Sequence, residues 1–274
     1  MHWETTSHEH CIAVGEYSER VGWADFLSDS LIVELGLVES RRFGLKIVNV
    51  RGGRGERSFQ GLRHAFSQLE FDVAVVRYPT DNRQVGTALK DLGYGILVTE
   101  PTVYWSKNLD KRSDPREVQQ LQRVSSVEAL ETLKNVVSSS FANYQSHWHH
   151  NPLTEDVDMV DVYVEWLEYA IGQPDHLAYS LQHDDDDLPI GMAMLRTDLS
   201  STEVLLAGIS ADHQGQGHYS SILRGVEALA HEVGSARLVI STQSANVNVQ
   251  KAWSRNGWSP MFTVQTVHVV RGNE

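Results

Sequence analysis

Two glycines separate an apolar run from a helical pattern in the stretch DHQGQGHYSSIL, residues 212–223. The first N–H groups of a helix have no partner inside it and carry the positive end of its dipole, so they attract anions. Glycine has no Cβ to keep a ligand away from these amides. The spacing therefore predicts a diphosphate site at the amides that Gly215 and Gly217 leave accessible.

Two common nucleotide-binding loops do not fit these residues. A Walker loop needs Lys-Ser or Lys-Thr after its last glycine, where this chain has His218 and Tyr219. The dinucleotide fingerprint needs a third glycine three residues after the second, where Ser220 stands. The loop either holds the diphosphate of another cofactor or only shapes a strand–turn–helix junction.

The elements around the loop predict an α/β (α+β) fold with a mixed central sheet and helices on both faces. A capping box from Ser125 to Glu128 predicts a helix that reaches about Tyr144. The other expected elements, in chain order, are strands near 45–50 and 71–78 with a helix after each, a helix over 157–171, a hairpin over 177–198, a strand over 202–210, a helix ending at Gly234, a strand over 236–242, a helix over 246–255 and a strand over 260–270.

An internal similarity divides the chain into two halves. The stretch NRQVGTALKDLGY, residues 82–94, aligns without gaps on NVNVQKAWSRNGW, residues 246–258, and each stretch follows an apolar strand. RGGRGE, residues 51–56, follows a strand much as the glycine loop does. We therefore expect related domains over 1–113 and 114–274, with the boundary in a charged stretch that is poor in apolar residues.

Composition narrows the classes of partner. With 274 residues, 41% hydrophobic and 22% charged, the chain can bury a core. Its net charge of -13 disfavours nucleic acid and anionic membranes as partners, so local amides must hold an anionic cofactor. No apolar run has bilayer length and the first residues do not resemble a signal peptide, which makes a cytoplasmic location the expectation.

Three clusters of potential metal ligands lack the spacing of known metal sites. Zinc sites need paired ligands at set distances, and a calcium loop needs a glycine and a distal glutamate. The clusters are His8, His10 and Cys11, then His147, His149 and His150, and lastly the acidic run 183–187. We expect no metal, and the single cysteine excludes an internal disulfide.

The glycine loop resembles the pyrophosphate loop of the GNAT superfamily of N-acetyltransferases, Gln/Arg-x-x-Gly-x-Gly/Ala. Gln214 and Gly217 fill its first two fixed places, while Tyr219 stands where a small residue is usual. The order of expected elements also resembles the GNAT fold, with a partial GNAT-like half ahead of a complete one.

Further stretches resemble the acetyltransferases of dTDP-4-amino-4,6-dideoxygalactose (dTDP-fucosamine). ESRRFGLKI at 39–47 is similar to their Asp-Ser-x-x-Phe-Gly segment. HWHHNP at 147–152 is similar to their Arg-Tyr-His-x-Asp-Pro segment, with His147 for Arg and Asn151 for Asp. The likeness spans nearly the whole chain, although no single motif decides it.

This resemblance implies direct acetyl transfer from acetyl-CoA to an amine, most readily that of a nucleotide-linked amino sugar. Backbone N–H groups near Ile209 would polarise the thioester carbonyl, and Asn246 would hydrogen-bond the cofactor. The amides that would hold the diphosphate are those of Gln214, Gly215, Gln216, Gly217, His218 and Tyr219. The partner is then a small molecule, with a homodimer as a possible assembly. An acceptor of another kind (a small amine, amino acid, antibiotic or protein N-terminus) remains open.

The catalytic groups depart from the family pattern. Trp253 stands where the superfamily often has a Tyr general acid, and an indole N–H donates a hydrogen bond but no usable proton. Solvent or Tyr219 would then protonate the thiolate, or the chain is a CoA-binding module with little catalysis. His149 is the candidate base, with Glu203 and His218 as lesser ones.

Overall fold

The computed structural model describes residues 12–16, 22–55, 61–109, 121–171, 173, 175–182, 188–198 and 200–271. The chain forms two compact units, and each unit is assembled from separate stretches. Unit 1 comprises residues 1–102, 147–155 and 262–274, and unit 2 comprises residues 103–146 and 156–261. The expected boundary near residue 114 lies outside the described residues, and the division into two related halves stays a prediction.

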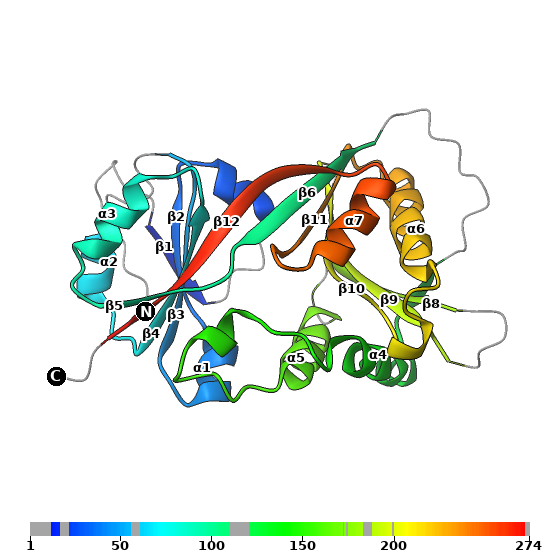
Figure 1. Cartoon of the computed structure of the whole chain (residues 1–274), viewed down its shortest axis with the longest axis horizontal. Helices are drawn as coiled ribbons and strands as arrows, with labels where there is room; N and C mark the ends of the chain where they lie inside the picture. The colour runs from blue at the N-terminus through cyan, green and yellow to red at the C-terminus, as the bar shows by residue number, and fades with distance from the viewer. Residues whose placement is uncertain are drawn as a thin grey trace. The chain divides into compact units, whose positions relative to one another are not determined.

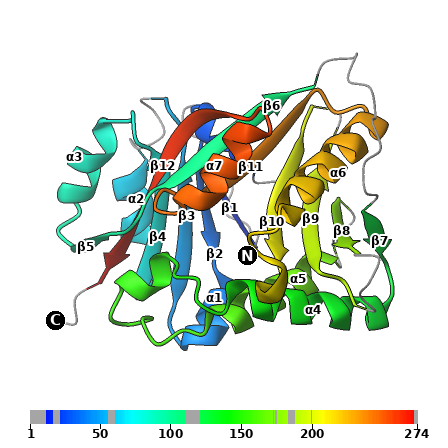
Figure 2. The same cartoon turned by 45° about the vertical axis from the view of Figure 1, so that its right-hand side comes forward.

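Unit 2 is built on a mixed sheet with helices on both faces. The strand order is β6 (Thr102–Asn108), β11 (Arg237–Gln243), β10 (Thr202–Ile209), β9 (Gly191–Thr197), β8 (His176–Leu181) and β7 (Gln122–Val124). One face packs against α4 (Val127–Phe141) and α5 (Met159–Ile171), and the other packs against α6 (His218–Glu232) and α7 (Val247–Arg255) (Figures 1 and 2). The apolar residues of these helices recur every three or four positions, which places them on the sheet side. The predicted fold class is confirmed.

Unit 1 is also built on β-strands. Its strands follow the order β1 (Ile12–Glu16), β2 (Leu31–Leu35), β3 (Ile47–Gly52), β4 (Val73–Pro79) and β12 (Ser259–Val270), and β5 (Gly95–Val98) also pairs with β12. The helices α2 (Leu62–Gln68) and α3 (Gln84–Lys90) pack Phe66 and Val85 against the apolar face of β3 and β4. The short helix α1 (Leu37–Phe43) joins β2 to β3. Sequence patterns missed β2, because its apolar residues do not alternate with polar ones.

Helix α4 begins one residue later and ends earlier than the sequence predicts. Its N-cap is Ser126, whose Oγ accepts a hydrogen bond from the N–H of Ala129 at 3.2 Å, and not Ser125. The helix ends at Phe141, three residues before Tyr144. The capping side chain satisfies one of the N–H groups that a helix start leaves without a partner, so Ser126 fixes the register.

The two stretches with internal similarity adopt the same local structure. Each follows a strand, forms a short helix and ends at a glycine in the left-handed region, Gly93 at φ 74° and Gly257 at φ 80°. A left-handed residue after the last turn is a common helix C-terminus, and glycine adopts it without strain. The two stretches thus share a local structure, and the relation between the two halves of the chain stays a prediction.

Four side chains of unit 1 form a buried chain of polar contacts. Arg77 Nη2 lies 2.9 Å from His147 Nε2, His147 Nδ1 lies 2.8 Å from His268 Nε2, and Asn151 Nδ2 lies 3.0 Å from His268 Nδ1. His268 and Asn151 are fully buried. These contacts tie residues 147–155 to β4 and β12, so that this stretch belongs to unit 1 although its neighbours in sequence belong to unit 2.

These four side chains form a hydrogen-bond network in which two protons compete for one contact. Arg77 can only donate, and Asn151 Nδ2 also donates because Asn151 Oδ1 accepts from the N–H of Leu153 at 3.0 Å. Both outer imidazole nitrogens must therefore accept. Each neutral ring then directs its single proton into the contact between His147 and His268, where only one proton fits.

Several sequence expectations fall on residues outside the described ones: His8, His10 and Cys11, the acidic run 183–187, and the end of the 51–56 loop. Among the residues that the structure describes, no group of three or more His, Cys, Asp or Glu side chains is arranged to hold a metal ion. Within the same residues, every helix is too short or too polar to cross a bilayer.

Candidate functional site

The glycine loop takes the backbone form that only glycine adopts easily. Gly215 has φ 76° and Gly217 has φ 91°, and Gly217 is the N-cap of α6. A Cβ added at either glycine would meet no atom within 4 Å. The left-handed backbone therefore favours glycine at both positions, and the space in front of the loop is open.

Both glutamines of the loop use their side chains to hold the loop itself. Gln214 Nε2 donates to the carbonyl of Ile209 at 3.0 Å, and Gln216 Nε2 donates to the carbonyl of Asp212 at 3.0 Å. Ser139 on α4 accepts from the N–H of Ala211 at 2.8 Å. The amides of Gly215, Gln216 and Gly217 have no recorded acceptor among the described residues, so they are available to an anion.

Strands β10 and β11 separate just before the loop. They pair in parallel only from Thr202 to Val204, whereas β10 stays paired with β9 as far as Ile209. The N–H of Ser210 donates to Ile190 on the β9 side at 2.8 Å. Because successive residues of a strand face opposite edges, the N–H groups of Ala207 and Ile209 face the side that β11 has left.

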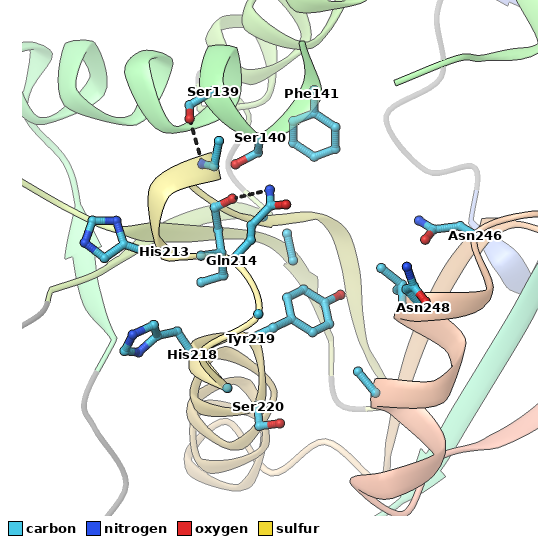
Figure 3. A pocket seen from close by; sticks show the side chains of 18 of the residues that line it. Ser139, Ser140, Phe141, His213, Gln214, His218, Tyr219, Ser220, Asn246 and Asn248 are labelled. Atoms are coloured by element: carbon cyan, nitrogen blue, oxygen red, sulfur yellow. Dashed lines mark hydrogen bonds between the residues drawn. The ribbon is translucent and has the colours of Figure 1, made fainter. Parts of the chain in front are cut away.

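A cavity of about 840 Å³ lies in unit 2 at this separation (Figure 3). The C-terminal turn of α4, the end of β10, the glycine loop with the first turn of α6, and one face of α7 line it. As far as the described chain lines it, the cavity contains no Asp or Glu, while Lys251 and Arg255 contribute cationic groups. In a chain with a net charge of -13, this lining favours an anionic ligand.

Tyr219 and Trp253 form a hydrogen-bonded pair beside the cavity. Trp253 Nε1 lies 3.1 Å from Tyr219 Oη, and since an indole N–H can only donate, the phenol oxygen accepts. The phenol proton therefore remains available to another acceptor, and the hydroxyl points toward the α7 side of the cavity, where Asn248 lies (Figure 3). Burial raises the pKa of Tyr219 to about 12, so the hydroxyl keeps its proton near neutral pH.

The comparisons with known proteins agree with this geometry. The model of the acetyltransferase (GNAT) family matches residues 141–258, which include the separated strands, the glycine loop and α7. This part of the chain is therefore similar to a GNAT acetyltransferase domain. No curated protein sequence matches the chain.

Solved structures resemble the chain well beyond residues 141–258. A GCN5-related N-acetyltransferase from Sphaerobacter thermophilus has 12% identity and a TM-score of 0.54, over 83% of this chain and 74% of that one. A tandem GNAT protein from the clavulanic acid biosynthesis pathway has 13% identity and a TM-score of 0.52, over 83% and 76%. A functionally unknown conserved protein from Staphylococcus epidermidis ATCC 12228 has 10% identity and a TM-score of 0.54, over 83% and 85%. Identities this low show a shared fold alone.

The residues that the sequence singles out are not all at the cavity. Those that line it are Ile209, Gln214, Gly215, Gly217, His218, Tyr219 and Asn246. Gln216 and Trp253 are not among the lining residues, and Trp253 is buried behind Tyr219. The Nδ2 group of Asn246 donates to Thr242 Oγ1 at 3.1 Å. The roles of these residues stay predictions.

The candidate bases lie in different surroundings. His149 lies in a 3-10 turn (His147–His150) that belongs to unit 1, and its side chain is half-buried. Glu203 is nearly buried and forms an ion pair with Arg196 on the neighbouring strand β9. Of these three residues, His218 alone lines the cavity of unit 2.

Sequence reasoning missed two groups of lining residues. Asn248, Lys251 and Arg255 share one face of α7, and their spacing of three and four residues is the only sequence signal that could have found them. Ser140 also lines the cavity, and its buried hydroxyl has no hydrogen-bond partner among the described residues. An added Cβ on Gly208 would lie 2.9 Å from this hydroxyl, which shows how closely α4 approaches β10.

The corresponding loop of the first half is closed. The N–H of Gly53 donates to Ser30 at 3.0 Å, and that of Gly55 donates to Ser28 at 3.3 Å. A Cβ on Gly53 would approach the Ser28 carbonyl oxygen to 2.0 Å. In its described part, this loop therefore packs against the chain, and its glycine amides face protein acceptors. Of these two loops, the one with Gly215 and Gly217 is the open one.

Proposed function

We propose that this protein transfers an acetyl group from acetyl-CoA to an amine. The acceptor that we propose is the amino group of a nucleotide-linked amino sugar. One observation carries the proposal: an open left-handed glycine loop at a helix start adjoins two separated strands, in a cavity whose described lining contains no carboxylate. Acetyl-CoA is the acetyl donor that GNAT acetyltransferases use.

The lining residues fit the parts of this cofactor. The amides of Gly215, Gln216 and Gly217, together with the positive end of α6, would hold the diphosphate. The unpaired edge of β10, with the N–H groups of Ala207 and Ile209, would hydrogen-bond the amide-containing arm and the thioester oxygen. Asn246 and Asn248 offer further polar contacts from α7.

Bound acetyl-CoA supplies an activated acyl carbon, which the amine nitrogen attacks as the carbon–sulfur bond breaks. The chain contributes three functions to this transfer. The N–H of Ile209 stabilises the negative charge that develops on the acyl oxygen. Tyr219 donates its phenol proton to the departing sulfur, and Trp253 keeps the phenol oxygen in place. His218, which lines the cavity, or water takes the proton from the amine.

Replacing Tyr219 with phenylalanine tests the role of its hydroxyl. We expect kcat to fall about tenfold to hundredfold, because solvent must then protonate the sulfur. The affinity for acetyl-CoA should change by less than about threefold, since the ring and the loop remain. Steady-state thiol release and calorimetry measure the two quantities. The variant Tyr94→Phe, in the core of unit 1, is the control and should keep both. An unchanged kcat in Tyr219→Phe would assign the proton to solvent.

The acceptor rests on the resemblance to the dTDP-fucosamine acetyltransferases, which extends over both halves of the chain. Calorimetry with acetyl-CoA, followed by thiol release with dTDP-linked amino sugars and with simple amines, tests it. Release with the nucleotide sugars supports the proposal, and release with simple amines alone replaces this acceptor by a small amine. Tight binding without release for any acceptor would favour the CoA-binding module.

A further inference from the structure

Two cations on α7 share the cavity with the glycine loop. Lys251 and Arg255 are one helical turn apart, line the cavity and are exposed. Among the described residues, neither forms an ion pair or hydrogen bond through its side chain, whereas Lys107 and Lys134 pair with glutamates. Unpaired cations in a cavity without carboxylates indicate that their counter-charge belongs to a ligand.

The last turn of α7 lies beside the first turn of α6. Asn256 Nδ2 donates to Ser220 Oγ at 3.1 Å, and Trp253 contacts Tyr219, so Arg255 stands next to the helix start that carries the open amides. The amides and the cations thus form two neighbouring anion sites of different kinds. Backbone amides suit a diphosphate that lies close to the chain, while long flexible cationic side chains suit a phosphate that projects toward solvent.

We propose that Lys251 and Arg255 bind the 3′-phosphate of coenzyme A and thereby select it over its 3′-dephosphorylated form. This inference rests on the proposed function, because it assigns the second anion site to the second phosphate group of the same cofactor. A phosphomonoester carries nearly two negative charges at neutral pH and accepts several hydrogen bonds from Lys and Arg. The two side chains therefore determine which form of the cofactor the domain takes up.

Calorimetric titration with coenzyme A and with 3′-dephospho-coenzyme A tests the assignment without any turnover. The native protein should bind coenzyme A at least about tenfold more tightly, in line with one to two charge-assisted contacts at an exposed site. The double variant Lys251→Gln, Arg255→Gln keeps good helix formers on α7 and should bind both ligands with the affinity that the native protein has for the dephosphorylated one. Arg224→Gln, an exposed cation of α6 outside the cavity lining, is the control and should keep the preference.

The outcomes separate this inference from the proposed function. If neither ligand binds the native protein, the proposed function fails. If both bind equally, or if the double variant keeps the preference, the assignment of Lys251 and Arg255 is overturned while acetyl-CoA binding stands. Arg255 also lies in the last turn of α7, where a cation stabilises the helix dipole. A double variant that melts earlier yet keeps the tenfold preference assigns both cations to that structural role.

Discussion

The double variant Gly215→Val, Gly217→Val is expected to abolish measurable binding of acetyl-CoA, with a loss of affinity of at least about a hundredfold. Both residues have positive φ, 76° and 91°, where a β-branched residue costs about 1–3 kcal/mol. The loop would relieve this strain by turning its peptide units, and the amides of residues 215–217 would then no longer converge on one anion. Isothermal titration calorimetry with acetyl-CoA measures the effect.

Two further variants show whether the backbone shape or general instability causes the loss. Gly44→Val with Gly93→Val introduces the same strain in unit 1, at φ 64° and 74° and with no atom within 4 Å, and should leave binding intact. Asparagine tolerates left-handed backbone, so Gly215→Asn with Gly217→Asn should bind within about tenfold of the native protein. A folded valine variant that binds normally would show that this loop does not hold the diphosphate.

Acidification is expected to destabilise the protein well before its carboxylates protonate. Burial, with Arg77 and His150 nearby, lowers the pKa of His268 from 6.5 to about 3, and burial together with Arg77 lowers that of His147 well below 6.5. Both histidines are neutral in the folded protein and take up protons on unfolding below pH 6.5, so stability falls as the pH falls. The loss is on the order of 1 kcal/mol per pH unit for each histidine. Urea unfolding between about pH 7.5 and pH 4.5 measures it.

The variant Asn151→Asp distinguishes this network from the other titrating groups. A carboxylate at this position accepts from His268 Nδ1–H and from Leu153 N–H, so the conflict between the two imidazole protons disappears. The introduced carboxylate also raises the pKa of His268. For Asn151→Asp we expect the free energy of unfolding at pH 7 to rise by about 1 kcal/mol and its loss on acidification to become smaller. For Asn151→Leu we expect the free energy of unfolding to fall. If both variants lower the stability equally at pH 7, the two imidazole protons do not compete for the contact between His147 and His268.

Local signals in the sequence predicted the elements and the loop of the second half. The glycine conformations, the apolar spacing of α6 and the helix over 246–255 depend on near neighbours in the chain, so a sequence can reveal them. The resemblance to GNAT enzymes added the cofactor and the role of the edge near Ile209. The sequence also offered Tyr219 as an alternative proton donor to the sulfur, and that role stays a prediction. The contact between Tyr219 and Trp253 is a finding of the structure.

Contacts between distant residues could not be predicted in this way. His147 and His268 are 121 residues apart, and nothing in the spacing of either residue indicates that they meet. Ser139 secures the glycine loop from a helix 72 residues earlier, and Gln214 uses its side chain on the loop itself. Lys251 and Arg255 look like ordinary surface cations until the fold places them at the cavity. Such functions depend on which faces the folded chain brings together.

Strand β12 affects the order in which the protein can fold as it is made. Residues 262–270 of this strand belong to unit 1 and pair with β4, from Val264 opposite Pro79 to Val270 opposite Val73. During translation β4 leaves the ribosome long before β12 does, and its edge must wait without that neighbour. Chaperones that shield bare strand edges should therefore associate with released chains truncated before residue 262 and not with released chains that include residues 262–270.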